Sequence, residues 1–327
     1  MESKRITYLD LTKLWAIFLV CMGHTFGMLS VGEGALPCRM LYTFHMGLFV
    51  LMCGFFSHHS LSMPFAPFIK KKTLQLLLPT AVYVCLNILA TCLVAGSCPM
   101  DFMRNEAIGG MWFLRTLFAC YVYVWLVLRL PGAVWLKGML SIVVALLFPH
   151  GYFLQFNYML IFFWMGYALK GREHILRKSL GVVFVASLMV YLNVPWQEPQ
   201  VLTYDVLFHH PLQLPIQLAG GLGGALLSLA VIYFHSQIFG GGWCDKLAKM
   251  GRYTLAIYGL QGVLLQNVVE RLCYIDARLC SPSVQEFFVA PLIAATMVWI
   301  CYAIARLMER NKITAMLFLG TSPKPSR

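Results

Sequence analysis

Long apolar runs follow one another along almost the whole of this chain, and they leave it few ways to fold. A helix that crosses a bilayer needs about 20 mostly apolar residues. Ten stretches meet this description, at roughly 9–29, 38–57, 74–95, 111–130, 133–149, 152–169, 179–195, 214–235, 252–269 and 286–306. Only 12% of the residues are charged, against roughly 25% in a typical soluble domain. The sequence therefore predicts an all-α polytopic membrane protein with about ten transmembrane helices, forming one domain over residues 1–327.

The basic residues predict how these helices are oriented. With the N-terminus in the cytoplasm, 19 of the 25 Lys and Arg residues fall in inner segments and only four in outer ones. This agrees with the positive-inside rule. The fifth and sixth spans are short and are separated by a tight turn at 149–151; merging them would place the basic C-terminal tail outside. We therefore predict ten spans in the inner (plasma) membrane, with both termini cytoplasmic.

Several other features are given simple structural interpretations. The net charge of +12 does not indicate nucleic-acid binding, because the basic residues form short clusters between apolar runs. Most of the 11 cysteines are expected to be small buried apolar residues, and no metal site is expected. A disulfide between Cys273 and Cys280 remains open. The glycines at 220–224 are expected to allow close helix packing. The outer loop at 195–213 is long enough to form a lid or a wall of a site.

Four ionisable side chains lie inside the predicted spans, where they are costly and therefore candidates for function: Lys13, His24, His45 and Arg115. Lys13 and His24 are nearly on one face of the first helix, about 16 Å apart along its axis. By residue count the two histidines and Arg115 fall in the outer third of the bilayer, where they could line one cavity. Alternatively, Lys13 and Arg115 snorkel to the interfaces, and the histidines make hydrogen bonds between helices.

Six short motifs along the chain carry a resemblance to a known family. They are Tyr8-Leu9-Asp10 with Lys13 and Gly23-His24; Phe44-His45-Met46-Gly47-Leu48-Phe49 with Gly54-Phe55; Phe68-Ile69-Lys70-Lys71-Lys72 with Pro79; Trp112-Phe113-Leu114; Phe163-Trp164-Met165-Gly166-Tyr167; and Gly251-Arg252-Tyr253-Thr254 with Ile257-Tyr258. Their order and positions resemble those of the acyltransferase family 3 membrane proteins. Three positions depart from the family's pattern: Lys13 replaces the commoner Arg, Gly47 replaces Pro, and Gln261 replaces a frequent His.

The resemblance implies an integral membrane O-acyltransferase, commonly an O-acetylase similar to fucose 4-O-acetylases. Enzymes of this kind move an acyl group from acyl-CoA to a hydroxyl of a cell-surface carbohydrate or glycolipid. Acetyl-CoA would then be a co-substrate, with no cofactor permanently bound, and the partners would be the acceptor and membrane lipids. A transporter or flippase of a glycolipid or small solute is the alternative, since such proteins also carry ionisable residues within the membrane.

Acyl transfer to a hydroxyl requires a base for its proton and stabilisation of the tetrahedral oxyanion. We predict that His24 is the general base, because imidazole titrates near neutral pH. An acyl-histidine intermediate is the alternative. His45 would orient His24 or the acceptor, and Arg115 would stabilise the oxyanion or bind acceptor oxygens.

The donor is predicted to bind toward the cytoplasmic side. Lys13 would pair with the CoA phosphates, helped by Lys70, Lys71 and Lys72 in the basic segment that precedes the third span. The extended pantetheine arm is comparable in length with the offset of about 16 Å between Lys13 and His24, so the thioester could reach His24.

Overall fold

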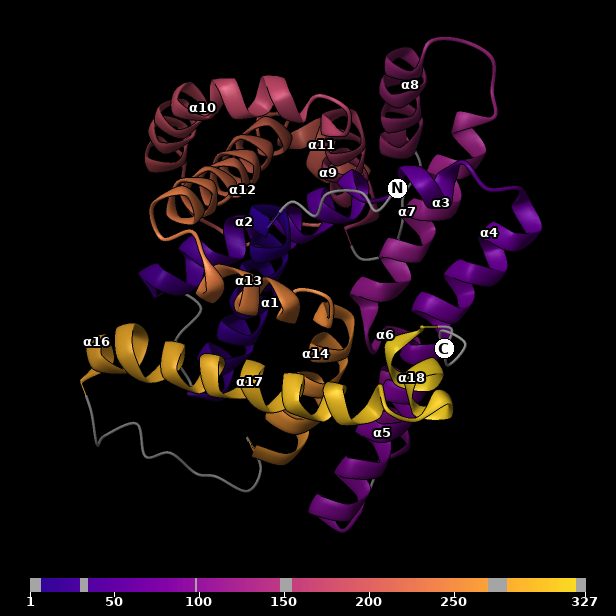
Figure 1. Ribbon diagram of the computed structural model, residues 1–327. Coiled ribbons are helices and arrows are strands. Elements are labelled where there is room, and N and C mark those ends of the chain that lie inside the picture. The colour runs from indigo at the N-terminus through magenta and orange to yellow at the C-terminus, as the bar shows by residue number, and fades with distance from the viewer. Residues whose placement is uncertain (1–6, 30–34, 98, 148–154, 270–280, 322–327) are drawn as a thin grey trace. The chain divides into compact units, whose positions relative to one another are not determined.

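The computed structural model (Figure 1) describes residues 7–29, 35–97, 99–147, 155–269 and 281–321, and this part of the chain is helical and contains no strand. Seven of its helices are long and apolar enough to cross a membrane. They are α1 (Thr7–Met28), α2 (Leu36–Phe55), Phe65–Ala95, Met100–Leu128, α10 (Glu173–Asn193), α12 (Gln213–Ile238) and Pro282–Met308. The predicted fold class is confirmed.

Three further apolar helices are shorter, and they coincide with the remaining predicted spans. They are α8 (Val134–Leu147), α9 (Phe156–Leu169) and Thr254–Val269. Each of the ten predicted stretches therefore contains an apolar helix, but seven reach the length that a crossing requires. Ten crossings remain a prediction. The predicted turn at 149–151 and the cysteine pair at 273 and 280 lie outside the described residues.

Three long helical segments each contain a π-helical stretch. α4 (Phe65–Lys72) continues through η1 (Thr73–Leu77) into α5 (Leu78–Ala95). α14 (Thr254–Gln261) continues into η2 (Gly262–Val269), and α16 (Pro282–Val284) continues through η4 (Gln285–Val289) into α17 (Ala290–Met308). In α5 and α17 a proline stands in the first turn after the π stretch. Proline has no N–H to donate to the preceding turn, so a wider turn accommodates it there.

The long segment Met100–Leu128 consists of α6 (Met100–Gly109) and α7 (Trp112–Leu128). The remaining helices are short: α3 (His58–Leu61), α11 (Tyr204–His209), α13 (Gly242–Met250) and α18 (Lys312–Leu319). The described residues fall into two compact units. The first lies within 1–16, 39–68 and 119–252, and the second within 17–38, 69–118 and 253–327.

Glycines in the first unit allow its helices to pack with backbone against backbone. On α2, a Cβ at Gly54 would overlap the carbonyl oxygen of Phe163, and on α9 a Cβ at Gly166 would overlap the carbonyl oxygen of Leu51. Close approach through small residues is the usual way in which membrane helices associate. The motif glycines Gly54 and Gly166 thus hold α2 and α9 together from both sides.

The glycine run on α12 has the same purpose, as predicted. A Cβ at Gly221 would overlap Tyr158 and Phe162 of α9, and a Cβ at Gly224 would overlap Phe44 of α2. The Tyr158 hydroxyl donates a hydrogen bond of 3.0 Å to the Gln217 carbonyl. α12 also lies beside α10 over much of its length (Figure 1).

The second unit is centred on Tyr83, a fully buried residue of α5. Its hydroxyl lies 3.4 Å from the carbonyl oxygen of Ala256 in α14 and 3.2 Å from that of Phe318 in α18. Gly259 of α14 lies against the Tyr83 ring, which a Cβ there would overlap. One buried aromatic residue therefore joins three helices of this unit.

Candidate functional site

The first motif of the chain is packed into the first unit by residues far along the sequence. The Thr7 hydroxyl donates to a carboxylate oxygen of Asp245 at 3.2 Å, and the Tyr8 ring meets the Tyr233 ring edge to face. A Cβ at Gly251 would overlap the carbonyl oxygen of Asp10. Two motifs that lie about 240 residues apart in the sequence are therefore in direct backbone contact.

Lys13 is held in place by the same motif. Its ammonium nitrogen lies 2.6 Å from Asp10 Oδ1, and it also stands 4.4 Å from the centroid of the Phe56 ring. The side chain is 25% exposed, so its charge is neither fully buried nor fully in solvent. An ammonium carries more than one N–H donor, so the ion pair with Asp10 leaves capacity for a further anion. The phosphate role of Lys13 remains a prediction.

His24 stands on the same continuous helix as Lys13. α1 runs from Thr7 to Met28 without interruption, which confirms that the two residues share a helix and are about 16 Å apart along it. His24 is half-buried and belongs to the second unit, whereas Lys13 belongs to the first. One helix thus carries both the proposed phosphate contact and the proposed base.

His45 is buried in the first unit, and a hydrogen bond defines its tautomer. Its Nδ1 lies 3.0 Å from the carbonyl oxygen of Leu41, one turn earlier on α2. Because a carbonyl only accepts, Nδ1 carries the proton, and Nε2 bears the lone pair whenever the ring is neutral. The Tyr42 ring meets the imidazole edge to face at 5.1 Å between centroids. Its role in orienting His24 or the acceptor remains a prediction.

Arg115 lies in the first turn of α7, where its guanidinium caps the end of α6. It donates hydrogen bonds to the carbonyl oxygens of Ile108 and Ala107, with the second at 2.9 Å. The last carbonyls of a helix have no partner within it and carry partial negative charge, so a cation there is favourable. Arg115 is therefore tied to neighbouring backbone in the second unit. Its predicted oxyanion role is untested.

The three lysines before the third span differ in exposure. Lys70 is exposed, Lys71 is half-buried, and Lys72 is buried with an exposed fraction of 6%. They occupy the last turn of α4, where consecutive residues point in different directions. They do not form one uniform basic face.

A buried polar network in the second unit was not predicted. The amide of Asn87 on α5 donates to a carboxylate oxygen of Glu106 on α6 at 2.7 Å. Asn267 on η2 donates to Asn87 Oδ1 at 3.2 Å and accepts from the Thr91 hydroxyl at 3.1 Å. Asparagines within apolar stretches are the sequence signal that could have indicated it. The network joins α5, α6 and η2, and α6 is the helix that Arg115 caps.

We expect Asn267→Ala to lower the thermal stability of the purified protein. The substitution leaves Asn87 Oδ1 and the Thr91 hydroxyl without these partners in a buried region, at a cost of about 1–3 kcal/mol. Thermal unfolding in detergent measures the effect. Asn193→Ala is the matched control, because Asn193 is exposed and its amide bonds only to the carbonyl one turn earlier, among the bonds described. Equal melting temperatures for the two variants would contradict a stabilising network.

The late motif contributes packing and one strong hydrogen bond. Tyr253 donates a hydrogen bond to a carboxylate oxygen of Glu309. Gln261 is buried, and its amide donates a hydrogen bond to the Tyr258 carbonyl at 3.2 Å. Nothing in these contacts gives Gln261 a chemical role.

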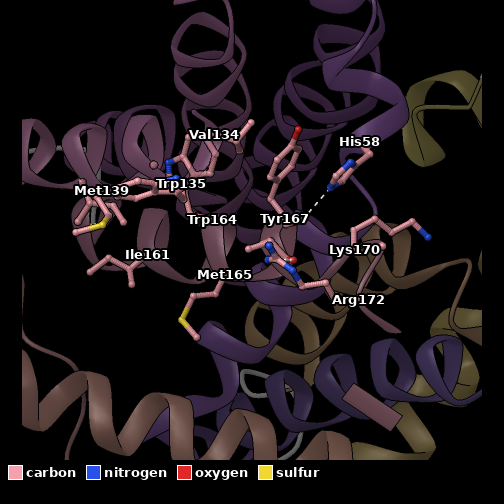
Figure 2. Close-up of a pocket in the computed structure, with 14 residues that line it drawn as sticks. His58, Val134, Trp135, Met139, Ile161, Trp164, Met165, Tyr167, Lys170 and Arg172 are labelled. Atoms are coloured by element: carbon pink, nitrogen blue, oxygen red, sulfur yellow. Dashed lines mark hydrogen bonds between the residues drawn. The ribbon is translucent and has the colours of Figure 1, made fainter. Parts of the chain in front are cut away.

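Described residues of the first unit line at least two cavities. One of about 630 Å³ lies along α8 and α9 and reaches His58, Lys170 and Arg172 (Figure 2). The other, of about 280 Å³, lies against Tyr8, Arg177 and Tyr233. None of the seven predicted site residues lines either of these cavities. Neither cavity is therefore the one predicted around His24, His45 and Arg115, and that cavity remains a prediction.

The helices and these side chains define a class of protein: a polytopic helical membrane protein with ionisable groups held within its apolar helices. The chain belongs to the acyltransferase 3 family, described as an acyltransferase domain, because that family's sequence profile matches residues 6–306. It is thus a membrane acyltransferase, which favours the enzyme over the transporter alternative. No curated protein and no solved structure matches the chain. The likeness to fucose 4-O-acetylases within the family remains a prediction.

Proposed function

We propose that the protein transfers an acyl group, with acetyl as the first candidate, from acyl-CoA to a hydroxyl of a cell-surface carbohydrate or glycolipid. The observation that carries the proposal is α1, a single helix of an acyltransferase-family chain that holds Lys13 near one end and His24 toward the other. A cation and an imidazole at a fixed offset of about 16 Å suit a donor whose phosphates and thioester lie at opposite ends of an extended arm.

The chemistry requires one proton transfer in each direction. His24 takes the proton of the acceptor hydroxyl while the hydroxyl oxygen attacks the thioester carbonyl carbon. The carbonyl oxygen becomes an oxyanion, which Arg115 stabilises in this proposal. When the intermediate collapses, the carbon–sulfur bond breaks, and the leaving thiolate takes the proton from protonated His24. The products are an O-acyl ester and free CoA.

His45 supports this mechanism through its tautomer. With Nδ1–H donated to the Leu41 carbonyl, Nε2 is the acceptor nitrogen of the neutral ring, and in this proposal it orients the acceptor hydroxyl or His24. It would act as a positioning residue rather than as the base. In this proposal His24 takes the proton, and His45 orients the reacting groups.

The proposal is tested with the purified protein in lipid nanodiscs, supplied with radiolabelled acetyl-CoA and a panel of mono- and oligosaccharide acceptors. We expect labelled acceptor and a stoichiometric release of free thiol. Thiol release without labelled acceptor would indicate hydrolysis only. A bound ligand must stabilise the folded state, so a donor that binds should raise the melting temperature. The donor assignment would be overturned if no acyl-CoA supported turnover and none changed the melting temperature.

We expect Lys13→Ala to raise the KM for acetyl-CoA by about tenfold or more, with a smaller effect on kcat, because a phosphate contact distant from the reacting atoms mainly affects binding. Lys13→Arg, which restores the residue commoner in the family, is expected to keep the KM close to that of the parent. Lys246→Gln removes an exposed charge elsewhere on the first unit and serves as the control. An unchanged KM in Lys13→Ala would exclude the phosphate role.

A further inference from the structure

The larger cavity of the first unit has two chemically different parts. Its walls are mainly apolar: α9 contributes Ile161, Trp164, Met165 and Ala168, and α8 contributes Trp135 and Met139 (Figure 2). The four α9 residues follow the i, i+3, i+4, i+7 spacing of one helix face. Trp135 and Met139 are 68% and 60% exposed, and large exposed apolar side chains on an apolar helix of a membrane protein are expected to contact lipid. The slot is therefore open to hydrocarbon.

One end of this slot is basic. Lys170 and Arg172 follow directly after the last residue of α9 and line the cavity together with His58 of α3. The charge distribution of the sequence predicts that this end lies at the cytoplasmic face, where anionic lipids attract basic segments. An anionic phospholipid has the matching chemistry, because its acyl chain would fit the apolar slot and its phosphate would meet the cations at the end of the slot.

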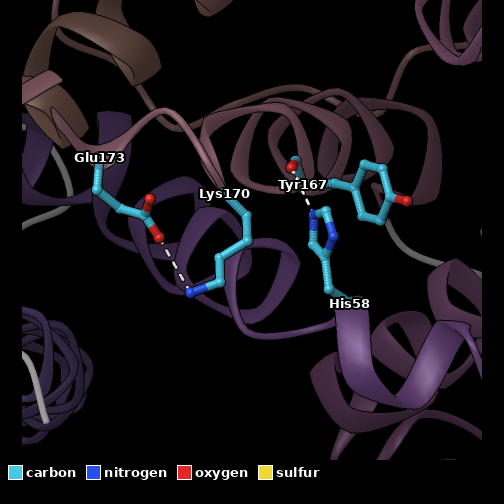
Figure 3. A network of polar contacts seen from close by, with 4 residues as sticks. All are labelled: His58, Tyr167, Lys170 and Glu173. Atoms are coloured by element: carbon cyan, nitrogen blue, oxygen red, sulfur yellow. Dashed lines mark hydrogen bonds and ion pairs between the residues drawn. The ribbon is translucent and has the colours of Figure 1, made fainter. Parts of the chain in front are cut away.

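The basic end is held in shape by contacts within the unit (Figure 3). His58 Nε2 donates to the Tyr167 carbonyl at 2.8 Å, and the two rings are stacked with centroids 3.9 Å apart. Lys170 pairs with Glu173 Oε1 at 3.0 Å and stands over the Phe55 ring. Arg172 donates one hydrogen bond of 3.0 Å to the Ala168 carbonyl. A carboxylate therefore offsets part of the Lys170 charge, and Arg172 supplies the less compensated cation.

We infer that this cavity, defined by α8, α9 and the His58–Lys170–Arg172 rim, binds one anionic phospholipid from the membrane. An acyl chain lies in the apolar slot, and the phosphate lies against Arg172 and Lys170. The volume of about 630 Å³ is within the range of roughly 300–1,000 Å³ that ligand pockets occupy. The site contains none of the residues assigned to acyl transfer, so it is a second site that is independent of the proposed reaction.

The test compares lipids that share their acyl chains. The full-length protein in detergent is titrated with phosphatidylglycerol, with phosphatidylcholine and with glycerol 3-phosphate, and binding is followed by the shift in melting temperature and by native mass spectrometry. We expect phosphatidylglycerol to bind about tenfold or more tightly than phosphatidylcholine, since basic groups near the surface attract anionic headgroups. Glycerol 3-phosphate is expected to bind far more weakly, because it has no chain to bury. Equal affinity for the two lipids, or full protection by glycerol 3-phosphate, would overturn the inference.

Variants separate the two halves of the site. The double variant Lys170→Gln, Arg172→Gln should abolish the preference for phosphatidylglycerol. The single variant Arg172→Gln should reduce this preference, and it provides the test if the double variant folds poorly. Ile142→Trp adds bulk to the apolar wall and should weaken both lipids together. Lys246→Gln with Lys312→Gln removes the same number of exposed charges outside the cavity and should change neither. A full lipid preference in Arg172→Gln and in the double variant would contradict the site.

Discussion

Replacing His24 by Ala is expected to lower kcat for acyl transfer by about 10²–10⁴-fold, which is the usual contribution of a general base. The physical reason is that an alcohol attacks a thioester slowly unless its proton is removed during the attack. His24→Ala should leave the acetyl-CoA-induced shift in melting temperature intact, because the donor phosphates are assigned to Lys13. The measurement is initial rate in nanodiscs at saturating donor.

The matched control for this prediction is His235→Ala, an exposed histidine near the end of α12. It removes an imidazole of the same chemistry outside the proposed site and should retain parental activity. Full activity in His24→Ala would refute the general-base assignment. A labelled acetyl group trapped on His24 by rapid quenching would instead favour the covalent alternative.

The largest expected loss of stability comes from Gly166→Ala on α9. A methyl group there would overlap the Leu51 carbonyl oxygen of α2, which is backbone and cannot turn aside. Separating the two helices should cost about 1–3 kcal/mol or more, because overpacking strains a close contact. We expect a clearly lower melting temperature in detergent, or loss of monodisperse protein during purification.

Gly181→Ala on α10 is the control for Gly166→Ala. Nothing lies within 4 Å of a Cβ at Gly181, so the added methyl group meets open space. Alanine is also the better helix former by about 0.8–1.0 kcal/mol, so the melting temperature should be unchanged or higher. Similar losses in both variants would mean that α2 and α9 do not depend on the close approach at Gly166.

The sequence was sufficient to predict the fold class, because apolar runs of this length have no other stable arrangement. It also located the helices, including the two short ones at Val134–Leu147 and Phe156–Leu169, and the close packing at 220–224. The π-helical stretches were not predicted; a proline follows two of them, η1 and η4, but η2 contains none, so no single residue type marks them. Hydrophobic periodicity alone does not distinguish such a turn from an α-helical one.

The candidate site, unlike the fold, remains a prediction. The sequence selected Lys13, His24, His45 and Arg115 as candidates from the cost of placing them among apolar residues, and each of them lies on a helix where one was expected. Their partners were not predicted, because the Asp10 pair of Lys13 and the α6 carbonyls that bind Arg115 depend on side-chain rotation and on a helix end. The polar network of Asn87, Glu106 and Asn267 was missed for a related reason. It joins the consecutive helices α5 and α6 to η2, which lies far along the sequence.

The contact between Gly251 and the Asp10 carbonyl has a consequence for exchanging parts between relatives. The patch that orients Asp10, and through it Lys13, is built partly by residues near position 250. A hybrid that takes its opening helix from one homologue and the segment from α13 onward from another would combine two surfaces selected separately. Breakpoints for such hybrids should keep both segments from a single parent, because the Asp10 carbonyl that a side chain at 251 would meet is backbone and cannot be removed by substitution.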